Sequence, residues 1–233
     1  MKSIRMFTPD DMVTELVDHD YNVLPLLSRF SIPLGFGTRK VADVCMSAGI
    51  DVDVFLLIIN FVISGRIDER RLERVSPDAI VDFLHRSHDY FMGYKFPHIR
   101  RNLLSALDEH QSDVNPAIIE FFDDYVRQVR IHFDYEETTV FPYVRALTEG
   151  RVSGYNIEEF RKHHDEVAEK LSDLKNVIMR YYNTSVPDNM YDVLVDLFNC
   201  EEDLESHNII ENKMLIPMVE RMEHKPKAKG DRR

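Results

Sequence analysis

Two segments of the chain share the pattern His-x3-Glu-x5-Pro, and this repeat constrains the fold more than any other feature. They run from His132 to Pro142 (HFDYEETTVFP) and from His207 to Pro217 (HNIIENKMLIP). Residues four apart on a helix project from one face about a turn apart, so each segment presents an imidazole and a carboxylate toward the same point. A single pair is expected by chance in an acidic chain with ten histidines. Two copies with an apolar pair and a proline at the same offset indicate two helices that contribute to one site.

Both pairs lie on the apolar stripes of their helices. At helical spacing one stripe contains Phe121, Tyr125, Val129, His132, Glu136 and Val140, and the other contains Val193, Leu197, Cys200, Leu204, His207, Glu211, Leu215 and Met218. Side chains on such stripes become buried when helices pack together. A buried carboxylate that has no partner costs several kcal/mol. The site must therefore contain something that compensates Glu136 and Glu211.

Four helix-start signals predict an all-α protein built around an antiparallel up-down-up-down four-helix bundle. They are Ser76-Pro77, Asn115-Pro116, Asn156 with Glu159 three residues later, and Pro187-Asp188. Four starts with short connections predict a bundle over residues 76–223. A small helical N-terminal domain is expected over 1–75, with helices after Thr8-Pro9 and near 23–30, 40–48 and 52–64. The basic segment 224–233 is expected to be a disordered tail.

Composition narrows the functional classes. Hydrophobic residues make up 44% of the 233 residues, so the chain can bury a sizeable core without needing disulfide bonds. Cys45 and Cys200 are too far apart in sequence for a disulfide framework or a thiolate metal motif, which favours a reducing cytoplasm. We expect no membrane span, because no stretch of about 18 apolar residues occurs. A net charge of -12 argues against nucleic-acid binding. The sequence contains no Gly-x-Ser-x-Gly motif, so a hydrolase is disfavoured.

The other two bundle helices also carry histidines on their apolar stripes. On the first helix the stripe contains Leu84, His88, Phe91 and Met92, and on the third it contains Phe160, His164, Val167, Leu171, Leu174 and Ile178. Four histidines and two glutamates would converge in the bundle. Imidazole and carboxylate ligands suit a pair of first-row transition metals, and iron is favoured because thiolates are absent. Zinc and manganese fit the same ligands. On the first helix either His85 or His88 could reach the metal.

This set of residues resembles the hemerythrin-like family, whose four-helix bundles hold two irons with His-x3-Glu motifs. It is most similar to the branch of repair-of-iron-centres or iron-sulfur cluster repair proteins, through HFDYEETTVFP, HNIIENKMLIP, KHHDEVAE and the short helical domain before the bundle. The resemblance implies a non-haem di-iron centre bridged by carboxylates and, as a further option, by an oxo group. The terminal ligands would be His88, His132, His164 and His207, and the bridges would be Glu136 and Glu211. His88 is favoured over His85 because SHDYF resembles the family's histidine motif.

Three further residues have two interpretations each. By the resemblance, His110 is an additional ligand or a neighbour of the ligands, and the alternative is a solvated histidine at a helix end. His163 occupies a position where the branch has a carboxylate lining the access route, or is simply exposed. Cys200 either touches the metal pocket or packs in the core. The branch's Cys-Cys pair is replaced here by Gly35-Phe36, and nearby Cys45 is expected to be a small core residue.

The residues and the resemblance together leave three functional hypotheses. The first is a cytoplasmic di-iron protein that repairs or protects iron-sulfur proteins under oxidative or nitrosative stress. It would bind or reduce nitric oxide or oxygen species, or donate iron to a damaged cluster. The second is reversible oxygen binding or sensing, and the third is a metal-free interaction bundle. The expected partners are a small diatomic ligand, iron-sulfur proteins and a second copy of the chain that docks through the N-terminal domain.

Overall fold

The computed structural model describes residues 5–108, 110, 113–151, 154–163, 169–184 and 187–224, with only the backbone at 163, 169, 170 and 187. Within these ranges the chain forms helices and no strand, apart from an isolated antiparallel bridge between Met12 and Lys40. The all-α prediction is therefore confirmed. None of the described helices combines the length and the apolar character that crossing a membrane requires. Contacts divide the chain into two compact units, Met1–Ser87 and His88–Arg233.

The first unit is built around one apolar helix. Its helices are α1 (Val13–His19), α2 (Val23–Arg29), α3 (Val41–Ala48), α4 (Val52–Ser64), α5 (Glu69–Leu72) and the beginning of α6 (Pro77–Tyr90). Eight consecutive residues of α4 are buried, from Val54 to Phe61. Among them, Asn60 accepts a hydrogen bond from Phe7 N (2.7 Å) and donates one to Phe7 O (2.9 Å), which ties the N-terminal segment to the core. The expected helix over 52–64 is found with the same limits.

The second unit is formed by four helical rods. The first rod is α6, η1 (Phe91–Lys95) and α7 (Phe96–Ala106), and the second is α8 (Asn115–Tyr135), η3 (Glu136–Val140) and α9 (Phe141–Thr148). The third is α10 (Ile157–His163) with α11 (Glu169–Tyr181), and the fourth is α12 (Pro187–Ile210), η4 (Glu211–Leu215) and α13 (Ile216–Glu223). The rods begin at the four predicted start signals. Asn156, for example, accepts a hydrogen bond from Glu158 N at 2.7 Å.

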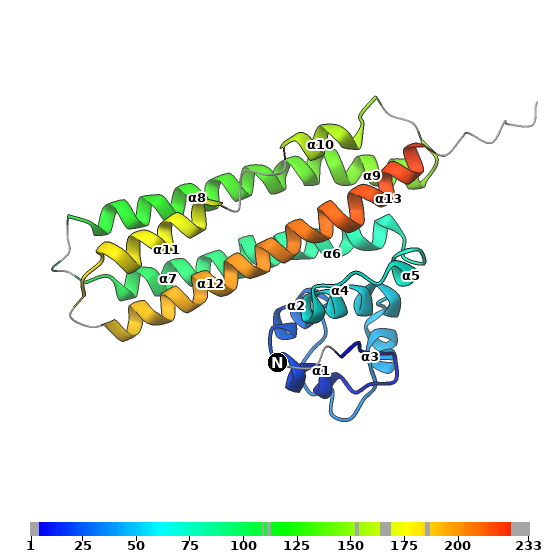
Figure 1. Cartoon of the computed structure of the whole chain (residues 1–233), viewed down its shortest axis with the longest axis horizontal. Coiled ribbons are helices and arrows are strands. Elements are labelled where there is room, and N and C mark those ends of the chain that lie inside the picture. Colours follow the sequence, from blue (N-terminus) through cyan, green and yellow to red (C-terminus); the bar gives the residue numbers. More distant parts are fainter. Residues whose placement is uncertain are drawn as a thin grey trace, which may run out of the picture. The chain divides into compact units, whose positions relative to one another are not determined.

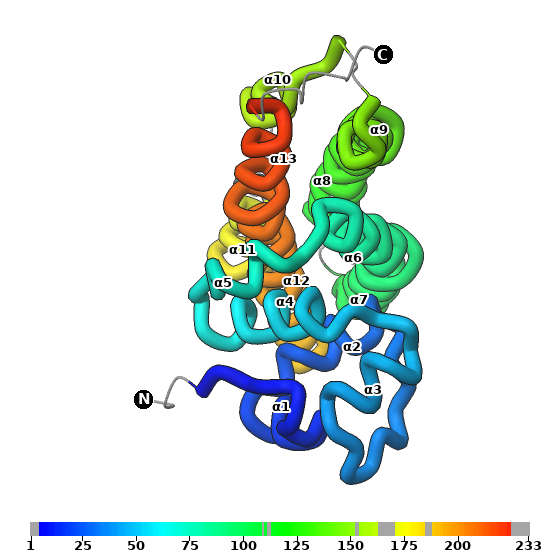
Figure 2. Tube along the Cα trace, turned by 90° about the vertical axis from the view of Figure 1, so that its right-hand side faces the viewer, coloured from blue at the N-terminus to red at the C-terminus, as the bar shows by residue number. Residues whose placement is uncertain are grey.

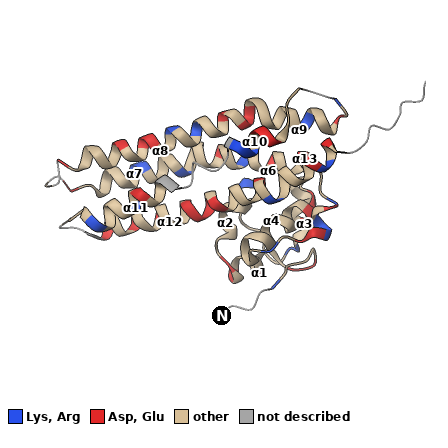
Figure 3. Ribbon diagram, turned by 45° about the horizontal axis from the view of Figure 1, so that its top comes forward, with Lys and Arg blue, Asp and Glu red and all other residues tan. Residues whose placement is uncertain are grey.

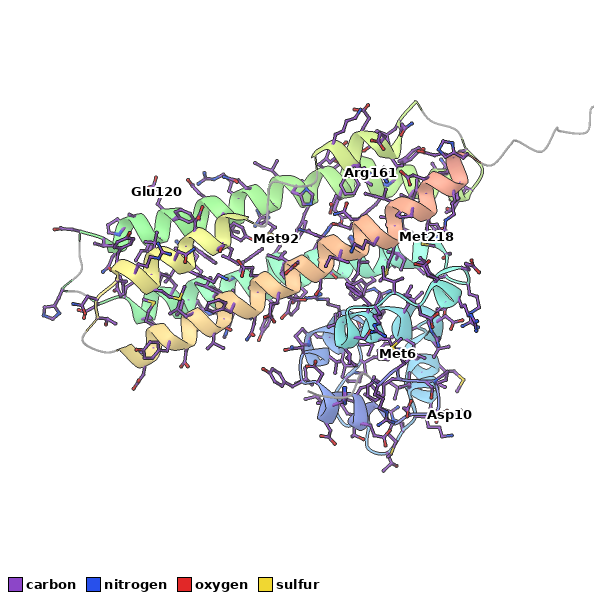
Figure 4. The ribbon with its side chains drawn as sticks, in the orientation of Figure 1. Met6, Asp10, Met92, Glu120, Arg161 and Met218 are labelled. Atoms are coloured by element: carbon purple, nitrogen blue, oxygen red, sulfur yellow. The ribbon has the colours of Figure 1, made fainter. Side chains whose placement is uncertain are left out.

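The rods close into a bundle around an apolar core. α7 packs against α8 and α12, and α11 packs against the same two helices, so each rod has two neighbours. Figures 1 and 2 show α7, α8, α11 and α12 side by side around a common interior. At the other end α10 is fastened to α13, because Arg161, labelled in Figure 4, pairs with Glu220 at 2.5 Å. The predicted antiparallel four-helix bundle is confirmed.

Three of the rods contain a π turn followed by a proline, which the sequence reasoning did not anticipate. In η1, η3 and η4 the N–H of the residue before the proline, namely Phe96, Phe141 and Ile216, donates to the carbonyl five residues earlier. A proline inside an α-helix lacks its N–H and clashes with the carbonyl four residues back, and the wider π turn accommodates that carbonyl. The turns at η3 and η4 begin at Glu136 and Glu211, the glutamates of the repeat.

Candidate metal centre

Four buried side chains from three rods converge in the second unit. They are His88 of α6, Glu136 of η3, His207 of α12 and Glu211 of η4, and each offers a nitrogen or oxygen atom within 4.8 Å of the others. His88 is 4% exposed, His207 1%, and both glutamates 0%. The apolar stripes place them inside, because their stripe neighbours Phe91, Val140, Leu204 and Leu215 are buried. A group of this kind could bind a metal ion.

The carboxylate of Glu136 lies between two histidines. Its Oε2 atom is 2.9 Å from Nε2 of His88, and its Oε1 atom is 3.0 Å from Nε2 of His132. On the fourth rod, Oε1 of Glu211 is 3.0 Å from Nε2 of His207. Each oxygen of Glu136 therefore faces an imidazole from a different rod.

The short contacts are not ordinary hydrogen bonds. Among the described residues, neither ring nitrogen of His207 has a hydrogen-bond partner, and the same holds for Nε2 of His88. Buried polar atoms are normally hydrogen-bonded, so these nitrogens need another explanation. Two ligands held at about 2.1 Å from one metal ion and at right angles to each other are about 3.0 Å apart. The observed separations match that value, and nitrogen with carboxylate oxygen suits first-row transition metals. The residues present fit a metal centre.

The electrostatics of the pocket favour a positive group. Burial and, after it, the nearby carboxylate of Glu211 raise the pKa of Glu136 to about 8, while His88 opposes the shift. Burial lowers the pKa of His132, with Glu211 acting in the opposite direction. Two carboxyl groups that lie close together in a site without water do not readily ionise together, because their negative charges repel each other. Uncharged imidazoles do not compensate this negative charge. A cation would supply the missing charge.

Aromatic rings wall the pocket. The His88 imidazole stacks on Phe133 at 3.9 Å between ring centroids and on Phe141 at 5.3 Å. His207 meets Phe91 edge to face at 6.1 Å. All three phenylalanines are at most 3% exposed, so they keep water from this side of the cluster. In a water-poor pocket the charges of Glu136 and Glu211 are poorly screened, which strengthens their attraction for a cation.

Comparison with known proteins identifies the family. The model of the hemerythrin HHE cation-binding domain matches residues 79–226, which is more than half of the chain. This chain belongs to the hemerythrin HHE family. A search of curated proteins found no significant match. The HHE match covers all four residues of the cluster together with His132.

His88 and His85 differ in burial within the HHE domain. His88 is buried in the cluster, whereas His85 is on the exposed side of α6. This agrees with the preference for SHDYF in the sequence. The neighbouring rods explain the outcome, because only His88 lies on the face that meets η3 and α12.

Two further candidates lie outside the cluster. The His110 side chain is 89% exposed and bonds to Asp108 at 2.8 Å. It precedes the start of α8 and is separated from His132 by about 25 Å of helix. Cys200 is 0% exposed within the apolar core of the bundle, two turns before His207. These positions correspond to the solvated and the packing interpretations, respectively.

The structure describes the remaining predicted residues to different extents. His164 lies outside the described residues, and for His163 only the backbone in α10 is described. His132 is close to Glu136, but it does not belong to the group of four residues whose ligand atoms all lie within 4.8 Å of one another. The ligand roles assigned to individual residues therefore stay predictions.

Two features of the HHE domain escaped the sequence reasoning. The first is Glu137, whose Oε1 atom is 2.6 Å from Nδ1 of His88. The doubled glutamate in HFDYEETTVFP was its signal. The second is a third copy of the π turn on the first rod, where Phe91 occupies the position of Glu136 and Glu211 relative to the following proline. Phe96-Pro97, which parallels Phe141-Pro142, was the signal for that copy.

Proposed function

We propose that the HHE bundle holds two iron ions in a carboxylate-bridged non-haem centre. The observation that carries this proposal is the position of Glu136, whose two oxygens face His88 and His132 separately. Glu211 would form the second bridge, since it contacts His207 and acts electrostatically on His132. His164, which lies outside the described residues, would complete the ligand set.

The protein's own residues would define what such a centre can do. Bound iron would supply an open coordination position for a diatomic molecule and one-electron exchange. Glu136 and Glu211 would neutralise part of the metal charge, and the imidazoles would leave the overall site cationic. Phe91, Phe133 and Phe141 would exclude water from this side, so a small uncharged ligand is favoured over a hydrated anion.

We further propose that the protein works in the cytoplasm in the repair or protection of iron-sulfur proteins under oxidative or nitrosative stress. It would react with nitric oxide or oxygen species, or donate iron to a damaged cluster. The motif resemblance supports this role. Thiol chemistry in the first unit is not part of the proposal, because burial raises the pKa of Cys45 to about 12 and a buried thiol is inert.

Metal content and spectroscopy test the proposal directly. Protein expressed in iron-rich medium and purified without oxygen should contain two irons per chain and should change its absorption spectrum when nitric oxide is added. Formation of nitrous oxide would support reduction of nitric oxide. A band that appears and vanishes reversibly with oxygen pressure would instead favour oxygen binding or sensing. Less than about one metal per two chains would support the metal-free bundle.

Alanine substitutions at the two glutamates test the bridging roles. Glu136→Ala and Glu211→Ala should each abolish iron retention while leaving the helical circular dichroism signal nearly unchanged. Removing either acid also removes its desolvation cost, so the metal-free variants should be at least as stable as the metal-free wild type. Glu120→Ala, on the outer face of α8 (Figure 4), is the control that should retain full iron. Full iron in both cluster variants would show that the bridging assignment is wrong.

A further inference from the structure

Three tyrosines touch one another at the end of the bundle where α13 packs against α9 and α10 (Figure 1). The hydroxyl groups of Tyr135 and Tyr155 are joined by a hydrogen bond of 2.8 Å. The rings of Tyr155 and Tyr143 meet edge to face, with 5.0 Å between their centroids. Tyr143 in turn donates a hydrogen bond to Oε1 of Glu223. These three residues, here called the tyrosine chain, therefore form a continuous path that ends at a carboxylate.

The inner end of the tyrosine chain reaches the candidate metal centre. Tyr135 directly precedes Glu136 in the sequence. The ring of Phe160 lies 6.5 Å from that of Tyr135 and 6.3 Å from the imidazole of His132, measured between centroids. Phe160 is 1% exposed, and its ring is within 15° of parallel to that imidazole. Ring contacts thus connect the histidine beside Glu136 with the far end of the tyrosine chain.

The outer end of the tyrosine chain has a proton acceptor. Tyr143 is 8% exposed, and Glu223, which receives its hydrogen bond, also accepts one from Ile157 N at 3.0 Å. Burial and, after it, the bond to Glu223 raise the pKa of Tyr143, so the phenol is protonated at neutral pH. A phenol that loses an electron becomes a strong acid, and an ionised carboxylate can accept its proton. Tyr143 can therefore give up an electron and pass its proton to Glu223.

We propose that the tyrosine chain is an electron relay through which Tyr143 supplies one electron to an oxidant at the metal centre. This inference rests on the proposed function, in which the centre meets oxygen species. With hydrogen peroxide as the oxidant, one electron comes from a ferrous ion and one from Tyr143. The O–O bond breaks to give two hydroxide ions, and the iron becomes ferric. The O–H bond of Tyr143 breaks to leave a neutral phenoxyl radical, and Glu223 gains the proton.

The first measurement uses full-length, metal-free protein with a ruthenium photo-oxidant attached at Ile131→Cys. Ile131 is 63% exposed and one helical turn before Tyr135, whereas the native thiols Cys45 and Cys200 are buried and should escape labelling. A laser flash in the presence of an electron acceptor creates a one-electron oxidant beside Tyr135. Transient absorption should then show a long-lived tyrosyl radical.

Variants of the outer end test where this radical settles. Tyr143→Phe keeps the ring and removes only the hydroxyl group, and Glu223→Gln removes the proton acceptor. Both should shorten the lifetime of the radical, because the electron hole no longer reaches a phenol that can lose its proton. Tyr94→Phe, at an exposed position on η1, is the matched control and should leave the lifetime unchanged. Equal lifetimes in wild type and Tyr143→Phe would overturn the relay.

The second measurement asks whether the metal centre uses the relay. Ferrous protein mixed with hydrogen peroxide and frozen rapidly should show a tyrosyl signal by electron paramagnetic resonance. Ring-deuterated tyrosine should narrow the signal, Tyr143→Phe should lose it, and Tyr94→Phe should retain it. A wild-type protein that binds iron but gives no such signal would contradict the proposal, as would an unchanged signal in Tyr143→Phe.

The two measurements separate failure of this inference from failure of the proposed function. Wild-type protein that binds no iron would refute the metal centre and the role of the relay there. The flash experiment contains no iron, so it still decides whether the tyrosine chain carries an electron. If the tyrosine chain only fastened the rods together, Tyr143→Phe would lower the melting temperature and leave the radical lifetime unchanged. Circular dichroism spectra that match the wild type confirm that the variants are folded.

Discussion

At the scale of single residues, the cost of burying acids determines how the metal-free site behaves. Glu136 and Glu211 are 0% exposed in a bundle with aromatic walls. The pKa of Glu136 is raised to about 8, first by burial and then by Glu211. Without metal, the folded protein therefore holds a proton on Glu136 at neutral pH. A metal ion must displace this proton, so metal binding should release protons.

The raised pKa of Glu136 predicts how the stability of the metal-free protein depends on pH. In the unfolded chain the carboxyl has its ordinary pKa of about 4.5, whereas in the folded chain its pKa is about 8. Between these values the folded state binds more protons, so the free energy of unfolding falls as pH rises and then levels off. Over this range the loss attributable to Glu136 should be on the order of a few kcal/mol.

Glu136→Gln isolates this contribution. Glutamine is neutral at every pH, so the variant should be more stable than wild type at pH 8 and similar at pH 5, by urea denaturation without metal. The lowered pKa of His132 has the opposite effect, because it reduces stability as pH falls. His132 is present in both proteins, so its effect cancels when the two free energies of unfolding are subtracted. Parallel stability curves for wild type and variant would contradict the assignment.

At the scale of elements, three rods contain the same kind of turn but place different side chains in the pocket. Each contains a π turn before a proline, and the residue that opens it is Phe91, Glu136 or Glu211. Because a phenylalanine opens the π turn of the first rod, this turn adds no further acid to the pocket. Phe91 also closes the pocket beside His207. The first rod contributes an imidazole, His88, and an apolar wall in place of a carboxylate.

Replacing Phe91 should destabilise the bundle through a cavity. Phe91 is 0% exposed, so Phe91→Ala should reduce the free energy of unfolding by about 3–5 kcal/mol, measured by chemical denaturation of the metal-free protein. Tyr94 lies on the same π turn but is 56% exposed, and Tyr94→Ala should change stability by less than about 0.5 kcal/mol. Similar losses in both variants would mean that burial does not determine the effect.

At the scale of the whole molecule, the cluster is confined to one unit. All four of its residues lie in His88–Arg233, whereas α6 begins in the other unit, where Phe83 packs against Phe30 at 5.0 Å. The domain boundary expected after residue 75 stays a prediction. Acidic residues recur along α8 and α12 (Figure 3), consistent with the net charge of -12. Such a surface favours the approach of cations.

A truncated chain tests whether the bundle carries the site by itself. A fragment that begins at Ser76 retains the start of α6, where Ser76 Oγ accepts a hydrogen bond from Ala79 N at 3.2 Å. It should bind as many metal ions as the full chain, because it contains the whole cluster. Its melting temperature should be lower, since Phe83 loses its contact with Phe30. A fragment that folds but retains no metal would show that the first unit contributes to the site.

The sequence by itself determined the helical class, the four rods and the placement of histidine and glutamate on their apolar stripes. Helix starts and apolar spacing are local properties, and placing His and Glu on an apolar stripe already implies burial. Only the tertiary structure decided between His88 and His85, because their exposure depends on the neighbouring rods. Likewise, Glu137 became significant only because the first rod brings His88 against it. Contacts between distant segments depend on how the helices pack, and the spacing within one helix does not specify that packing.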